Sequence, residues 1–87
     1  MTYKIEWSAA AARQFRGLPP QIQQRLRPVI SGLVDNPRPV GVKALEGRPG
    51  ALRIRLADYR VIYEVHDDVL LVLVVRVAHR REVYRRI

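Results

Sequence analysis

Three arginines stand where strand geometry would gather them on one surface: Arg53, Arg55 and Arg60. Successive strand residues point to opposite faces, so Arg53 and Arg55 share one face while the apolar residues between them point to the core. A tight turn at Ala57-Asp58 places Arg55 opposite Arg60. Like charges that oppose one another destabilise a sheet, and the pattern therefore predicts a patch that meets an anion. The alternative is a solvated sheet face on which Glu64 screens part of the charge.

A second group of residues able to do chemistry ends the chain: His79, Arg80, Arg81 and Tyr84. Histidine exchanges protons near neutral pH, and arginines can hold a phosphate and stabilise charge that develops on it. A tyrosine can stack on a base or bring its hydroxyl to the reacting group. This set would serve metal-free RNA cleavage, in which the ribose 2′-hydroxyl attacks its neighbouring phosphate. The alternative is a basic tail that docks on its own fold.

Other kinds of catalytic centre find no support in the sequence. His66 and His79 lie thirteen positions apart, without the spacing of metal ligands, and the chain has no cysteine. No glycine-rich phosphate loop leads from a strand into a helix, and no serine has a visible base. We therefore expect neither a metal ion nor a cofactor.

The overall charge favours an anionic partner. Lysine and arginine total 16 against 8 acidic residues, which gives a net charge of +8 and a sequence pI near 11.1. Lys4 and Lys43 are the only lysines, and the planar fork of arginine suits bidentate phosphate recognition. Such a chain attracts nucleic-acid backbones or an acidic protein. A basic protein without such a partner is the plainer alternative.

Length and composition predict one domain over residues 1–87. The chain is 48% hydrophobic, enough for one modest core. The lack of cysteine fits a reducing compartment. The N-terminus does not have the pattern of a signal peptide, and the longest apolar run, Val69 to Val75, is too short to cross a bilayer. These features predict a soluble, cytoplasmic protein that makes no membrane contact.

The elements that would position these residues begin with a strand and two helices. Alternation predicts a strand over Thr2–Trp7, and Ser8 caps a helix over Ala9–Arg16. Pro19-Pro20 open a second helix that Pro28 should kink or interrupt. Joined by a few residues, the two helices should form an antiparallel hairpin. The buried stripe of the second helix comprises Ile22, Leu26, Val29, Ile30 and Leu33.

A three-stranded antiparallel meander follows a loop over residues 36–50. Its strands are expected at Ala51–Leu56, Tyr59–His66 and Val69–Val77, joined by two-residue turns. The last run is almost wholly apolar, so we expect a central strand that is covered on both faces. A short basic tail or helix follows from His79 to Ile87. This order predicts an α+β fold with the helices packed on one sheet.

Two segments, "ALRIRLADYRVIYEV" and "VVRVAHRREVYRRI", resemble toxins of the RelE/ParE superfamily, and RelE-type toxins in particular. The likeness covers essentially the whole chain. It implies a RelE-like fold and the toxin of a type II toxin-antitoxin pair. RelE-type toxins are cytoplasmic endoribonucleases that enter the ribosomal A site, cut the messenger there and are silenced by a cognate antitoxin. The partners implied are an antitoxin, in a hetero-oligomer, and the ribosome with its mRNA.

The same resemblance implies roles for individual residues. Arg53, Arg55 and Arg60 would hold the scissile phosphate. Arg80 would stabilise the transition state or protonate the leaving group, and Tyr84 would stack on or orient a base. Further RNA contacts are expected from Arg76, Arg81 and Lys43.

One departure from the family concerns the general base. The positions of Arg53 and Arg55 are lysines in the best-known members, where a lysine is a candidate base. Arginine stays protonated and cannot take that proton. His79 is then the first candidate by its chemistry and neighbourhood, and Glu46 in the preceding loop is the second. Cleavage can otherwise rely largely on positioning by the ribosome.

Two alternatives stay open at this point. One is a ParE-like inhibitor of DNA gyrase, which binds a protein and cuts nothing. The other is a toxin whose catalysis has decayed and which only binds its antitoxin. The joint presence of arginines at the strand positions, of Arg60 and Arg80, and of Tyr84 favours the RelE-type interpretation.

Overall fold

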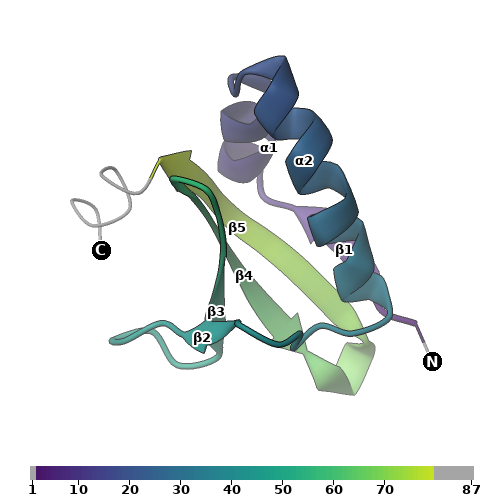
Figure 1. The fold of residues 1–87 in the computed structure, drawn as a ribbon. Helices are drawn as coiled ribbons and strands as arrows, with labels where there is room; N and C mark the ends of the chain where they lie inside the picture. Colours follow the sequence, from purple (N-terminus) through teal and green to yellow (C-terminus); the bar gives the residue numbers. More distant parts are fainter. Residues whose placement is uncertain (1, 80–87) are drawn as a thin grey trace.

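The computed structural model describes residues 2–79, which form two helices and one five-stranded sheet (Figure 1). The strands lie in the order β1-β5-β4-β3-β2. β1 runs parallel to β5, and the other neighbouring pairs are antiparallel. The predicted α+β class is confirmed. The short tail or helix expected over residues 80–87 lies outside the described residues. Within residues 2–79, no helix is long and apolar enough to cross a membrane.

The first strand and the first helix form where the sequence predicts them. β1 spans Lys4–Trp7 and α1 spans Ala9–Arg16. The Ser8 hydroxyl oxygen accepts the backbone N–H of Ala11 at 3.0 Å, which is the expected N-cap. The end of β1 thus leads directly into α1, and one of the free backbone N–H groups in the first turn of that helix has a hydrogen-bond acceptor.

The second helix, α2, spans Pro20–Ser31 and continues into a 3-10 turn, η1, at Gly32–Val34. Pro28 lies inside α2, and the helix runs on past it, so the expectation of an interruption is wrong. Leu26 and Ile30 are buried on either side of this exposed proline, and their packing holds the helix together across it.

The predicted hairpin of arginine-bearing strands is confirmed in its register. β3 spans Ala51–Leu56, β4 spans Tyr59–His66, and Arg55 opposes Arg60 directly. Ala57 occupies the first position of the two-residue turn with φ 53°, a left-handed conformation that such turns require. The hydrophobic and charged alternations therefore determine the same pairing.

The second connection differs from the expected two-residue turn. A 3-10 turn, η2, covers Asp67–Val69, and Leu70 follows with φ 52°. β5 then spans Leu71–His79. The strand begins two residues later than predicted and includes His79, which the sequence had assigned to the tail. The extra turn residues shift the register by two, which leaves the side-chain faces unchanged.

A β-bulge interrupts the β4–β5 ladder near its middle. Tyr63 pairs with Val74, but the preceding Ile62 pairs with Arg76, so Val75 is the extra residue. A bulge of this kind turns two successive side chains to the same face and restores alternation beyond them. As a result, Arg76 leaves the helix-covered face and Val77 joins it.

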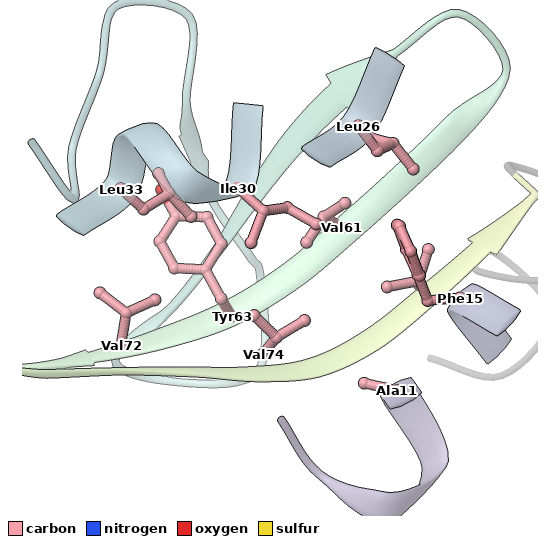
Figure 2. Close-up of a cluster of buried hydrophobic side chains, with 10 residues drawn as sticks. Ala11, Phe15, Leu26, Ile30, Leu33, Val61, Tyr63, Val72 and Val74 are labelled. Atoms are coloured by element: carbon pink, nitrogen blue, oxygen red, sulfur yellow. The ribbon is translucent and has the colours of Figure 1, made fainter. Parts of the chain in front are cut away.

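The helices cover one face of the sheet, and the main core lies between them (Figures 1 and 2). Figure 2 shows Leu26 and Ile30 of α2 above Val61 of β4, and Tyr63 beneath Leu33. β2, a short strand at Lys43–Ala44, borders β3 at the far edge. The buried members of the core are Ala11, Phe15, Leu26, Ile30, Leu33, Val61, Tyr63, Val72, Val74 and Val77.

The opposite face of the sheet carries no helix among the described residues. The apolar side chains buried on this face form a small cluster of Ala51, Ile62 and Ala78, with Leu45 and Val75 against it. The expected central position of the last strand is confirmed, because β5 lies between β1 and β4, and among residues 2–79 only its helix side is covered by other elements. Its apolar composition reflects one face in the core and one face that is half exposed, as at Leu73.

Candidate active site

The predicted arginines line a pocket on the sheet face that lies away from the helices. Its walls are Gly41, Lys43, Arg53, Arg55 and Arg60, and its volume is about 280 Å³. Lys43 opposes Arg53 in the β2–β3 pairing, as Arg55 opposes Arg60 in the next pairing. Three neighbouring strands thus direct four cationic side chains into one hollow, which suits a phosphate group.

The arginines of the pocket differ in how firmly they are held. Arg60 is only 4% exposed, and its Nη1 donates to the Tyr59 carbonyl oxygen at 3.4 Å. Arg55 is exposed, and its Nε donates to the Ala57 carbonyl oxygen at 3.5 Å. Arg53 is half-buried. A buried cation is costly unless it meets partners, so we expect the Arg60 side chain to be held in one orientation. The exposed side chain of Arg55 is free to move toward a ligand.

A buried hydrogen bond anchors the loop that delivers Gly41 and Lys43. The Tyr63 hydroxyl donates to the Pro37 carbonyl oxygen at 2.7 Å. Burial raises the pKa of Tyr63 to about 12, so the hydroxyl keeps its proton and remains a donor. The core side of β4 therefore holds in place a loop that ends at the pocket on the other side.

An exposed cluster ties the same loop to η2 and to Tyr3, the residue before β1. Arg38 binds the Asp67 carboxylate in bidentate fashion, with N–O distances of 3.1 and 2.8 Å, and the Tyr3 hydroxyl donates to it at 2.6 Å. Hydrogen bonds from Arg38 and then Tyr3 hold the pKa of Asp67 down at about 2. This carboxylate is ionised at neutral pH, so the loop has a second, electrostatic anchor.

Arg76 lies on the pocket's face because of the bulge. It opposes Ile62, which itself opposes Arg53, so a single buried residue separates the two arginines across the sheet. Arg76 is half-buried and is not among the residues that line the pocket. The structure thus places it on the surface leading to the site.

His79 does not lie with the arginines, and the neighbourhood expected for it is wrong. It opposes Tyr59 in the β4–β5 pairing, and the two rings meet edge to face with centroids 5.5 Å apart. Both line a different pocket, on the helix side, with Leu18 and Gln14. The bulge is the cause, since it reverses which residues of β5 face the helices.

The carboxylates near the pocket do not complete it either. Glu46 is exposed in the loop between β2 and β3 and is not part of the pocket wall. Glu64, which the alternative of a solvated sheet face would have screening the arginines, pairs with Arg48 at 3.1 Å and with His66 at 3.1 Å. Neither carboxylate therefore acts as the pocket's acidic partner in this arrangement.

The C-terminal candidates Arg80, Arg81 and Tyr84 fall outside the described residues, so their predicted roles stay predictions. Within residues 2–79, no three side chains of His, Cys, Asp or Glu gather as a metal site would require.

Gly41 is the pocket residue that the sequence did not single out. Its φ of 95° is a conformation that favours glycine, and it turns the chain just before β2. The many prolines and glycines in residues 36–50 indicated a loop, but they did not indicate which glycine borders the site.

The comparison with protein families decides the classification. A family model described as "ParE toxin of type II toxin-antitoxin system, parDE" matches residues 5–84. The chain belongs to the ParE toxin family. Among its curated relatives, "Toxin RelG" of Mycobacterium tuberculosis is 31% identical, over 99% of this chain and 100% of the relative. The "mRNA interferase toxin RelE" of Escherichia coli is 28% identical, over 97% of this chain and 92% of the relative. The expected RelE-type membership is confirmed.

Solved structures of RelE-RelB complexes agree with the fold. The toxin in the archaeal RelE-RelB complex from Pyrococcus horikoshii superposes with a TM-score of 0.80 at 28% identity, covering 92% of this chain and 97% of that chain. The intact E. coli RelBE toxin-antitoxin complex gives a TM-score of 0.79 at 25% identity, covering 88% and 95%. The RelE-like arrangement of helices and sheet expected from the sequence is therefore confirmed.

Proposed function

We propose that this chain is a cytoplasmic toxin that cleaves messenger RNA on translating ribosomes and is held inactive by an antitoxin. The observation that carries the proposal is the pocket of Lys43, Arg53, Arg55 and Arg60, built on a sheet face that no described helix covers. Relatives named mRNA interferases match the chain nearly from end to end, which supports this use of the pocket.

The geometry suits the chemistry of a phosphodiester. Buried Arg60 offers guanidinium donors in a fixed orientation, and exposed Arg55 can close over a bound strand from the opposite position. Negative charge on the phosphate oxygens grows as the ribose 2′-oxygen attacks, and pre-placed guanidinium groups stabilise it. The ribosome would supply the in-line alignment of the 2′-oxygen with the leaving 5′-oxygen.

An antitoxin partner follows from charge and from the family. The chain carries a net charge of +8, which favours an acidic partner segment. Several solved relatives are complexes of RelE with RelB. We expect this toxin likewise to be purified as a hetero-oligomer with its antitoxin.

The test is induced expression without antitoxin, followed by sequencing of messenger 5′ ends on ribosomes. The wild-type chain should arrest growth and leave new ends within translated regions. Arg55→Ala and Arg60→Ala should reduce cleavage by about 100- to 1,000-fold, the typical loss when one donor to a developing anion is removed. Arg25→Ala, at an exposed position of α2, is the matched control and should cleave normally.

Each alternative activity has its own outcome in this experiment. Growth arrest with DNA-damage signalling and intact messengers would indicate a gyrase inhibitor instead. No arrest from the wild-type chain, with antitoxin binding retained, would indicate a toxin that has lost catalysis. Circular dichroism and co-purification with antitoxin confirm in each case that the variant is folded.

A further inference from the structure

Metal-free cleavage of RNA requires a group that accepts the proton of the ribose 2′-hydroxyl. Three of the four cationic side chains in the pocket wall are arginines, which do not release a proton in proteins. The fourth is Lys43, whose ammonium can become a neutral amine with a free lone pair. We infer that Lys43 is the general base of this site, an inference that rests on the proposed cleavage of RNA.

The other candidates are excluded by their positions in the described part of the chain. His79 lies on the helix-covered face with Tyr59. Glu46 is exposed and outside the pocket wall, and Glu64 is paired with Arg48 and His66. Lys43 is thus the residue of the pocket wall whose side chain can both lose and regain a proton.

The register of β2 brings Lys43 to the position that this role requires. Residues that oppose one another directly have Cα atoms about 4.5–5.5 Å apart, so Lys43 and Arg53 form a single wall of the pocket. The ribose that is joined through its 3′-oxygen to a phosphate held by Arg53 would then lie beside this wall. The lysine stem is long and flexible, so Nζ can follow the 2′-oxygen.

The anchored loop keeps Lys43 in register. Gly41 turns the chain immediately before β2, and the loop that contains it is tied down at Pro37 and Arg38. β2 is only two residues long, so these anchors, more than the strand itself, fix where the backbone of Lys43 lies. The core-facing Tyr63 is therefore a positioning residue for Lys43.

The step can be written with its atoms balanced. The neutral amine of Lys43 takes the proton from the 2′-hydroxyl and becomes an ammonium. The 2′-oxygen forms a bond to phosphorus, the bond from phosphorus to the 5′-oxygen breaks, and the 5′-oxygen takes a proton from solvent. The products are a 2′,3′-cyclic phosphate and a 5′-hydroxyl, and the ammonium then returns its proton to solvent.

The first test separates the charge of Lys43 from its ability to accept a proton. Lys43→Arg keeps the positive charge and should bind a non-cleavable RNA within about twofold of wild type. Its cleavage rate on ribosomes should fall by about 100-fold or more, the usual contribution of a general base. The matched control is Lys4→Arg, the same change at the only other lysine, which is at an exposed position of β1 and should leave cleavage unchanged.

The second test uses the absence of cysteine from the chain. Lys43→Cys creates a unique thiol, which 2-bromoethylamine converts to a thioether analogue of lysine. The analogue should restore cleavage, and the rising limb of its pH–rate profile should lie at lower pH than in the wild type, because the sulfur makes the amine less basic.

Two outcomes would overturn the assignment. One is a Lys43→Arg variant that cleaves at the wild-type rate, and the other is a thioether analogue that restores cleavage with an unshifted pH profile. If the toxin is otherwise active, either result would mean that Lys43 only attracts the RNA by its positive charge and does not accept the proton. Failure of the proposed function is distinguishable from both, because the wild-type chain itself would then cut no messenger.

Discussion

The two faces of the same sheet obey different requirements. On the helix-covered face, β4 and β5 present Val61, Val72 and Val74, which are fully buried against α1 and α2. On the open face, the neighbouring residues of β3 and β4 are Arg53, Arg55 and Arg60. Burial of apolar surface provides most of the folding free energy on the first face. The second face holds like charges side by side, which lowers stability and leaves a surface ready for a polyanion.

The difference means that stability and activity should respond to different residues, even though the residues alternate along one strand. Deletions on the covered face should unfold the protein, and deletions of arginine on the open face should abolish activity in a folded protein. Tyr63 is the informative exception, because its ring lies in the core while its hydroxyl holds the loop that borders the pocket.

The largest expected effect on stability is at Leu26, which is 0% exposed in α2. Leu26→Ala should lower the free energy of unfolding by about 2–5 kcal/mol, since a large buried side chain leaves a cavity. Urea denaturation followed by circular dichroism measures the change. The remaining folded fraction should cleave messenger at the wild-type rate. Arg55→Ala is the reciprocal variant and should shift stability by no more than about 0.5 kcal/mol.

A smaller effect on stability, combined with an effect on activity, is expected at Tyr63. Tyr63→Phe leaves the Pro37 carbonyl without its donor and should lower the unfolding free energy by about 1–3 kcal/mol. Messenger cleavage should also decrease at temperatures where the variant is folded, because the loop carrying Gly41 is released. Tyr59→Phe removes a hydroxyl from the same face and should change both measurements less. Unchanged cleavage in Tyr63→Phe would show that the Arg38–Asp67 pair is a sufficient anchor.

The smallest effect is expected from Asp67, and it depends on pH. The pKa of Asp67 is lowered from 3.8 to about 2 in the folded protein, so the ionised form is favoured by folding. Its stabilising contribution is therefore complete above pH 4 and is lost as pH falls toward 2. Asp67→Asn should remove that part of the acid sensitivity of the melting temperature. Equal acid sensitivity in the variant and the wild type would contradict the assignment.

The sequence predicts the arginine pocket better than it predicts the end of β5. Arg55 and Arg60 could be paired from sequence because apolar and charged residues alternate together around a short turn. β5 offers no such contrast, since valines and leucines occupy both of its faces. Regular alternation from Val72 would put Arg76 in the core and His79 on the open face. The bulge reverses both placements, and nothing in a run of apolar residues indicates it.

Lys43 shows a second limit of sequence analysis. The charge of Lys43 was enough to predict that it contacts RNA. Its place in the pocket wall depends on how residues 36–42 fold. That path is set by contacts with residues distant in sequence, the Tyr63 hydroxyl and the Asp67 carboxylate. Such contacts are visible only once the sheet has formed.

Ser8 gives the fold a constraint that reaches from its first helix to its last strand. Its hydroxyl oxygen accepts from the Ala11 amide while its proton goes to the carbonyl oxygen of Val75, the extra residue of β5, at 3.1 Å. Aspartate could supply the first bond but not the second, and alanine neither. Threonine carries the same hydroxyl and can make both bonds, so the position requires a side chain that accepts and donates at once.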